Sequence, residues 1–300
     1  MSSPTTGPKK LLVASLKFTN ETSFTYSKEQ ITVLASGIKN FYNASSRGLI
    51  QVTDEVFLVD VPIVGNATSV LDQGAPYVKI KYPGRDMYII VSPFVHGDHS
   101  WPAQGYAYVF SCLITTGNHE TGHILKLQHS DTWSQASNGT WTLEKMQDGL
   151  SVMSRFSSNG LASPQYYFLG WFPLNEIVNV VSLPATITLK RINNFTGLGN
   201  SVVIVDEKLT KNQKQLFISF PQETKFFGAK PCVVLHLTYG SPYISGSEKI
   251  KTFTQGYYDE QFTGLNIEIA SSTSSTVTVN ITNVVPTVPY IVDNEPLDNQ

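Results

Sequence analysis

The chain has 300 residues, of which 41% are hydrophobic and 15% charged, and its formal net charge is −2. This length fits one large domain or two ordinary ones. The near-neutral charge excludes the basic footprint of a nucleic-acid-binding protein, and every apolar run is shorter than the roughly 20 residues that span a bilayer. We therefore expect no nucleic-acid partner and no membrane span.

The sequence gives mixed evidence on export. The polar start, 1–10, and the short apolar run 11–16 do not form a signal peptide, so the protein is intracellular, is exported unconventionally, or follows a removed signal. Two cysteines, Cys112 and Cys232, are too few for a disulfide framework and are predicted to be buried free thiols. Six N-x-S/T sequons are a slight excess over chance and favour a secreted protein: Asn20, Asn43, Asn66, Asn138, Asn194 and Asn280.

The first 110 residues show several strand patterns and one helix pattern. The apolar run 11–18 predicts a strand, and Ser27 with Gln30 forms a capping box before a helix that ends at Arg47-Gly48. The segment 64–84 is rich in Gly, Pro and Asn and predicts a loop. Further strands are predicted over 50–61, 87–91 and 106–110.

Residues 119–129 contain the candidate metal-ligating and catalytic side chains. His119 and His123 are four residues apart, so on a helix both imidazoles project from one face and can bind one divalent cation. Glu120 lies beside them as a general base, which is the arrangement of a zinc protease. His129 supplies a third nitrogen if the helix ends near Lys126 and the chain turns back. Three protein ligands and an open position suit catalytic Zn²⁺; the alternative is a surface helix with scattered histidines.

The chain then changes character. The segment 131–147 predicts a loop or a short hairpin, 148–154 a tight turn around Met153, and Ser163-Pro164 the start of a short helix. From residue 184 onwards, short β-like runs between Gly, Asn and Pro turns predict a β-sandwich. We therefore expect three parts, namely a catalytic domain over 1–183, a β-sandwich over 184–285 and a polar tail over 286–300.

These residues resemble the metzincin zinc endopeptidases, and within them the gametolysin-like family. Metzincins share H-E-x-x-H-x-x-G-x-x-H and a later methionine turn, which His119, Glu120, His123, His129 and Met153 match. The flanks also resemble that family, most strongly within 85–172 and more weakly after residue 200. The matching flank segments are 40–49, 148–154, 162–171, 216–221 and 233–238.

The resemblance implies an α+β fold, in which a metzincin-like domain with a mixed twisted sheet and an active-site helix precedes an all-β sandwich. It implies a secreted or cell-surface endopeptidase acting on extracellular-matrix or cell-wall proteins, with Met153 packed under the metal. The strand before the active-site helix, bearing Tyr106 and Tyr108, would be the cleft edge and bind an extended peptide substrate by strand addition.

Two positions depart from the family pattern. Lys126 stands where the motif has a glycine that ends the helix in a left-handed turn. We predict that Lys126 has a positive φ and that His129 still reaches the metal position. Arg155 stands where some metzincins have a tyrosine directed at the metal, so no tyrosine ligand is expected.

Other polar residues have two interpretations each. Asp131 either supports His129 through a hydrogen bond or is a solvated loop residue. His96 and His99 either bind a second metal or line the cleft, or they are ordinary loop histidines, and His236 on a predicted strand is structural.

Two functions remain open from the sequence. The first is a zinc metalloendopeptidase. The second is a non-catalytic metzincin-like scaffold that serves as a binding or structural protein, motivated by Lys126 and by the lack of a signal and of an inhibitory pro-segment. The intact Glu120 favours the first, because a purely structural zinc site has no need of that carboxylate.

Overall fold

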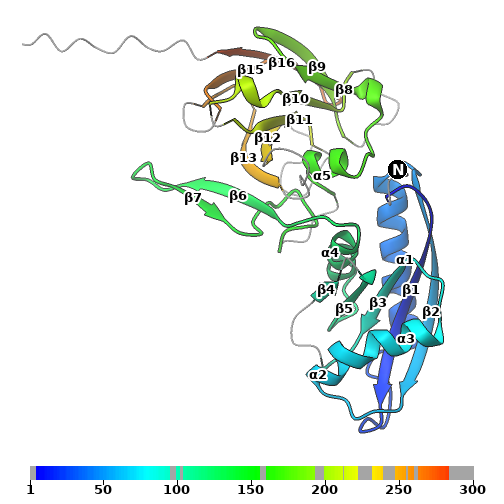
Figure 1. Ribbon diagram of the computed structural model, residues 1–300. Helices are drawn as coiled ribbons and strands as arrows, with labels where there is room; N and C mark the ends of the chain where they lie inside the picture. Colours follow the sequence, from blue (N-terminus) through cyan, green and yellow to red (C-terminus); the bar gives the residue numbers. More distant parts are fainter. Residues whose placement is uncertain are drawn as a thin grey trace, which may run out of the picture.

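The computed structural model describes residues 5–94, 99–101, 104–155, 160–192, 199–211, 213–221, 232–238, 247–254, 256–259 and 263–283. The described chain is a mixed fold of three sheets and few helices, consistent with the α+β class (Figure 1). Within it, each helix is too short or too polar to cross a bilayer.

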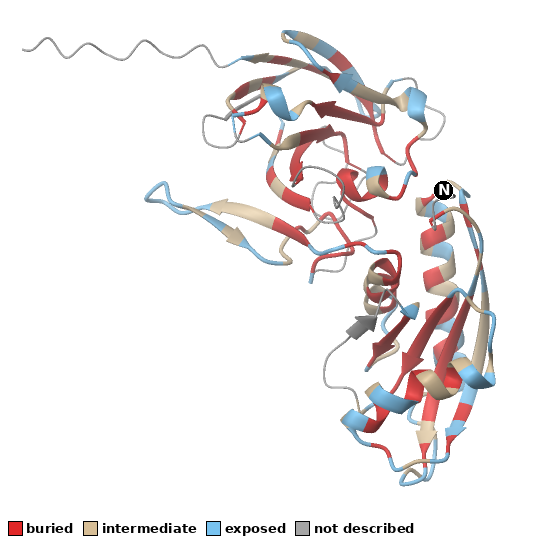
Figure 2. Cartoon of the chain, in the orientation of Figure 1, coloured by how far each residue is buried: buried red, intermediate tan, exposed pale blue. Residues whose placement is uncertain are grey.

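The N-terminal part is built on a five-stranded sheet of order β2-β1-β3-β5-β4. Four of its strands run parallel, and β4 is antiparallel at the edge. The strands are β1 (Gly7–Phe18), β2 (Ile50–Val61), β3 (Met87–Val91), β4 (His99–Trp101) and β5 (Tyr106–Val109). Buried residues fill both faces of this sheet, because helices cover it on either side (Figure 2).

One face packs on the long helices α1 (Lys28–Ser45) and α4 (Ile114–Ile124). The predicted capping box opens α1, since Ser27 Oγ accepts from the Gln30 amide and Gln30 Oε1 accepts from the Ser27 amide. Arg47 (φ 57°) and Gly48 (φ 79°) end the helix in left-handed conformations, as expected. These local signals therefore position the helix on which α4 packs.

The other face is covered by residues that were predicted to be a loop. They form α2 (Ala67–Ser69), a π-helical turn (Val70–Gly74) and α3 (Ala75–Lys81). The loop prediction was wrong because a buried tertiary contact overrides the glycine and proline signals. The Tyr108 hydroxyl donates to Val70 O at 2.5 Å and accepts from the Ala75 amide at 2.8 Å.

The C-terminal part is a sandwich of two sheets that share one apolar core. The larger sheet has the order β7-β6-β13-β12-β11-β10-β8. Its strands are β6 (Ser130–Gln135), β7 (Trp141–Glu144), β8 (Ile177–Val180), β10 (Val202–Val205), β11 (Gln215–Ser219), β12 (Val233–Thr238) and β13 (Ser247–Phe253). The smaller sheet has the order β14-β15-β16-β9, formed by Gly256–Asp259, Leu265–Ser272, Thr276–Asn283 and Ala185–Lys190.

The larger sheet crosses the predicted domain boundary at residues 183 and 184. Strands β6, β7 and β8 precede that boundary, yet β6 pairs in parallel with β13 and β8 in parallel with β10. The short helix α5 (Ser163–Phe168) and the 3₁₀ turns Leu174–Glu176 and Glu207–Leu209 complete the described elements. The two parts are therefore joined by a continuous sheet as well as by the chain.

A partly buried ion-pair cluster also joins the two parts. Arg47 Nη1 lies 2.8 Å from Glu176 Oε2, and Lys190 Nζ lies 2.7 Å from Glu176 Oε1. Arg47 Nη2 also donates to Ile192 O at 3.0 Å. Although burial raises the pKa of Glu176, hydrogen bonds from Lys190, Ser201 and Arg47 leave it below its usual range.

Candidate metal centre

Three histidines converge where α4 ends and β6 begins. His123 Nε2 lies 3.1 Å from His119 Nε2 and 3.2 Å from His129 Nε2. Among the described residues these three form the cluster that can hold a metal ion, with one ligand atom each and all ligand atoms within 4.8 Å of one another. His119 and His123 are half-buried and His129 is exposed, so the cluster opens to solvent. The structure thus brings together the three histidines that the sequence predicted as metal ligands.

Hydrogen bonds to carbonyl groups fix the tautomers of the two helical histidines. His119 Nδ1 lies 2.9 Å from Val152 O, and His123 Nδ1 lies 2.7 Å from Leu127 O. A carbonyl oxygen only accepts, so each Nδ1 carries the hydrogen and each neutral ring presents an Nε2 lone pair to the centre of the cluster.

Facing lone pairs at this distance repel one another unless a cation lies between them. With Zn–N bonds of 2.0–2.1 Å, tetrahedral geometry separates two ligand nitrogens by about 3.3 Å. The observed 3.1 and 3.2 Å separations are close to that value. Burial lowers the pKa of His123 to about 4, and burial together with the nearby His119 lowers that of His129. The rings of His123 and His129 are therefore neutral at pH 7, the form that binds metal.

The turn between the helix and the third histidine is the one predicted. Lys126 has φ 71°. The Lys126 amide donates to His123 O at 2.8 Å and the Leu127 amide donates to Gly122 O at 2.9 Å. This pair of bonds is a Schellman motif with lysine at the left-handed position, and it reverses the chain so that His129 returns to the cluster. The predictions for Lys126 and for the reach of His129 are both confirmed.

Lys126→Gly is expected to raise the free energy of unfolding by about 1 kcal/mol, because glycine adopts a positive φ without the steric cost of a Cβ atom. Urea unfolding of the metal-free protein measures the change. Lys126→Ala is the matched control, since it removes the same side chain but keeps the strain. Equal stability of the Gly and Ala variants would show that the turn is unstrained.

The turn around Met153 packs against helix α4. A Cβ atom at Gly122 would lie 2.3 Å from Met153 Sδ, so the fully buried methionine packs directly on the helix between its two histidines. The same turn supplies Val152 O to His119, and Met153 O accepts from the Ser130 amide at 3.0 Å. The turn thus touches both the helix and the start of β6.

Gln165 on α5 links this turn to the third ligand, a role that sequence reasoning missed. Its Oε1 accepts from Ser151 Oγ at 2.6 Å and from the Ala162 amide at 2.9 Å. Its Nε2 donates to Gln128 O, next to His129, at 3.3 Å. The capping-box position of Gln165 signals the bond to Ala162, but the bond to Gln128 spans 37 residues and has no local signal.

Glu120 lies on α4 between the two helical histidines and is 4% exposed. Its carboxylate is close to Tyr42, whose hydroxyl donates to Asn118 O at 2.5 Å. Burial first, and the charge of Glu120 second, raise the pKa of Tyr42 well above its usual range. Glu120 therefore lies in a low-dielectric setting, where a carboxylate interacts strongly with a nearby proton or cation.

Asp131 has a different role from either of the predicted ones. It is nearly buried, which excludes a solvated loop position. Its Oδ2 accepts from Lys145 Nζ and its Oδ1 from the Met146 amide, both at 2.8 Å. These are its hydrogen bonds within the described residues, so the expected hydrogen bond to His129 is not formed. Asp131 acts on His129 through its charge, which raises the pKa of His129 and so opposes the lowering caused by burial.

The predicted substrate-binding role of Tyr106 and Tyr108 is wrong. Strand β5 lies inside the sheet between β3 and β4, and both tyrosine side chains are buried on the face opposite α4. The sequence suggested an edge strand because β5 directly precedes the helix, but the short strand β4 pairs outside it.

The remaining predictions concern isolated residues. His236 is buried and structural, as expected, and its Nε2 lies 3.0 Å from Asp148 Oδ2. Cys112 and Cys232 are free thiols, of which Cys232 is buried and Cys112 half-buried. His96 and the side chain of His99 lie outside the described residues.

The chain matches no protein-family model, and no curated protein matches it significantly.

Proposed function

We propose that the chain is a zinc metalloendopeptidase of metzincin type, similar to the gametolysin-like family. The observation that carries the proposal is the convergence of three imidazole Nε2 atoms at 3.1 and 3.2 Å while two of the rings donate their Nδ1 hydrogens elsewhere. This donor set fits zinc. The substrate class, proteins of the extracellular matrix or cell wall, and the extracellular or cell-surface location rest on the resemblance alone.

The residues divide the work of hydrolysis. His119, His123 and His129 would hold the ion and leave one position open towards solvent. When bound, zinc supplies a water of lowered pKa and polarises the scissile carbonyl. The Glu120 carboxylate takes a proton from the attacking water and gives it to the departing amide nitrogen as the C–N bond breaks.

Among the described strands, β4 is the one best placed to bind an extended peptide. It is the last strand in the sheet order and packs near α4, so its outer edge can accept one further strand (Figure 1). This assigns to β4 the strand addition that the sequence suggested for β5.

The alternative, a non-catalytic metzincin-like scaffold, was motivated in part by Lys126. Lys126 still forms the left-handed turn that ends the helix, so this reason for the non-catalytic alternative is weaker.

Zinc analysis and proteolysis together test the proposal. The purified protein is expected to hold about one zinc per chain and to cleave casein or gelatin, and His123→Ala to lose both properties because two ligands hold the ion poorly. Treatment with a chelator followed by zinc should abolish and then restore cleavage. Stoichiometric zinc without cleavage of any protein or peptide library would contradict the protease, and absence of zinc would contradict the site itself.

A further inference from the structure

The third histidine is held by the C-terminal sheet. Ser130, the first residue of β6, follows His129 directly and pairs with Ser247 of β13. The Ser247 amide donates to His129 O at 3.4 Å, and the Ser130 and Ser247 hydroxyls lie 2.5 Å apart. The backbone of His129 is thus fixed by a strand that lies more than a hundred residues further along the chain.

A buried carboxylate extends this connection. Asp148 is 0% exposed and begins the turn around Met153. Its Oδ2 accepts from Ser130 Oγ at 2.7 Å and lies 3.0 Å from His236 Nε2, while its Oδ1 lies 3.2 Å from Lys249 Nζ. Burial alone would raise the pKa of Asp148, but the hydrogen bond and charge of His236, with the charge of Lys249, hold it far below its usual range.

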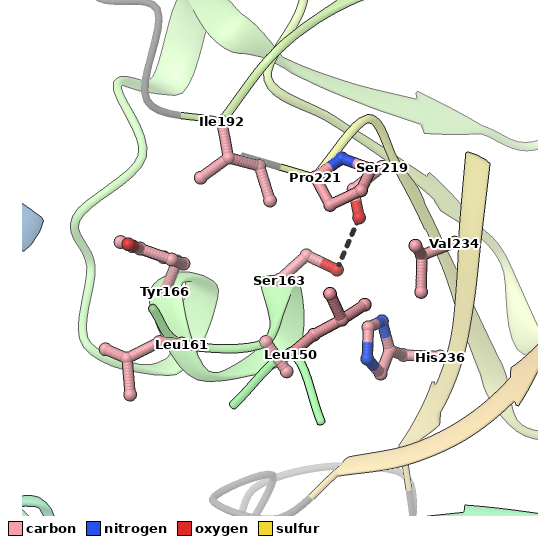
Figure 3. Close-up of a pocket in the computed structure, with 10 residues that line it drawn as sticks. Leu150, Leu161, Ser163, Tyr166, Ile192, Ser219, Pro221, Val234 and His236 are labelled. Carbon is pink, nitrogen blue, oxygen red and sulfur yellow. Dashed lines mark hydrogen bonds between the residues drawn. The ribbon is translucent and has the colours of Figure 1, made fainter. Parts of the chain in front are cut away.

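The pocket beside His236 is small, which limits the size of any molecule that can reach this side chain (Figure 3). The pocket has room for about one water molecule and is lined by both parts of the chain, including Leu150, Ser163, Ser219 and His236. His236 Nδ1 is buried and has no hydrogen-bond partner among the residues that the structure describes. A single water fits such an atom, whereas a substrate does not, so His236 has no direct access to a reacting group.

We propose that His236 and Lys249 are positioning residues for the metal centre, which act through Asp148 and Ser130 on His129. The inference rests on the proposed metal centre and adds that the β-sandwich is an integral part of it. Each step is an observed link between described groups: His236 and Lys249 contact Asp148, Asp148 accepts from Ser130, and Ser130 is joined to His129 by the peptide bond. Outer residues of this kind orient ligands and influence metal affinity.

Substitutions in the full chain test this connection. His236→Phe removes the donor to Asp148, and His236→Gln restores a donor near the same position. Ser247→Ala is a milder change that removes the hydroxyl group in contact with Ser130 Oγ. If His236→Phe does not fold, Ser247→Ala alone tests the positioning role. Ser219→Ala is the matched control, because this buried serine of the same sheet bonds Ser163 at 3.2 Å and lies outside the path to His129.

Two properties are measured for each variant. The first is zinc affinity against a competing chelator, and the second is the side-chain ¹⁵N–¹H spectrum of the histidines in the metal-free protein. His236→Phe is expected to weaken zinc binding about tenfold, as for other outer residues of metal sites, with recovery in His236→Gln. Ser247→Ala should shift the His129 resonances, and Ser219→Ala should leave both affinity and resonances unchanged.

The outcomes separate the two proposals. Unchanged zinc affinity and unmoved His129 resonances in both His236→Phe and Ser247→Ala would overturn the positioning role. If the wild type binds no zinc, the proposed function fails, but the His129 resonances of the metal-free variants still decide the positioning role.

Discussion

Glu120→Gln is expected to lower kcat for peptide cleavage by about 10²- to 10⁴-fold, the contribution of a positioned general base. Glutamine keeps the size of the side chain but cannot take a proton from water. KM should change little, because Glu120 acts on the attacking water and not on the bound peptide. Zinc content should stay the same, since the three histidine ligands are intact.

Steady-state cleavage of a fluorogenic peptide and metal analysis of the same preparations measure this effect. Glu144→Gln is the matched control, because it makes the same chemical change at an exposed position on β7. A Glu120→Gln enzyme with wild-type kcat would exclude Glu120 as the base. Loss of zinc together with activity would instead show that Glu120 maintains the site.

Asp148→Asn is expected to reduce the free energy of unfolding by about 3–5 kcal/mol, the usual cost of removing one partner from a buried ion pair. Asp148 is fully buried, and its loss leaves the Lys249 ammonium without its counter-charge and the His236 bond weakened. The control is Asp60→Asn, whose salt bridge with Lys17 lies at the surface and should contribute less than about 1 kcal/mol.

The pH dependence of this difference has a definite sign. The folded-state pKa of Asp148 lies below its unfolded value of about 3.9, so its contribution is complete above about pH 4 and is lost as the pH falls further. Asparagine does not titrate. Urea unfolding at pH 7 and at pH 3 should therefore show a smaller difference between wild type and Asp148→Asn at the lower pH, and a larger one would contradict the ionised, paired state.

Features that depend on a few neighbouring residues were predictable. The capping box at Ser27 and the shared face of His119 and His123 involve groups within four residues of one another. The left-handed turn at Lys126, expected from the resemblance, involves groups within five. Hydrogen bonds and side-chain directions over that distance follow from residue type and helical geometry, so the sequence predicts them directly.

Features that depend on how the chain returns to itself were not predictable. Tyr108 was assigned to substrate binding because the sequence does not reveal that β4 pairs outside β5. The segment 131–147 was interpreted as a loop or a short hairpin, and β6 and β7 do form an antiparallel hairpin. The pairing of β6 with β13, which follows about a hundred residues later, was not predicted. Strand pairing over such a separation depends on the whole fold, and a polar hairpin carries little hydrophobic pattern to reveal it.

The sequence alone therefore determined the chemistry of the candidate site: the three imidazoles, the adjacent carboxylate and a turn that brings His129 back. Only the tertiary structure decided what holds His129 in place, because Ser247 lies 117 residues from Ser130 and His236 lies 88 residues from Asp148. A helix fixes two of the candidate ligands through its own backbone bonds, whereas the third candidate ligand follows the turn and takes its position from the sheet that it joins.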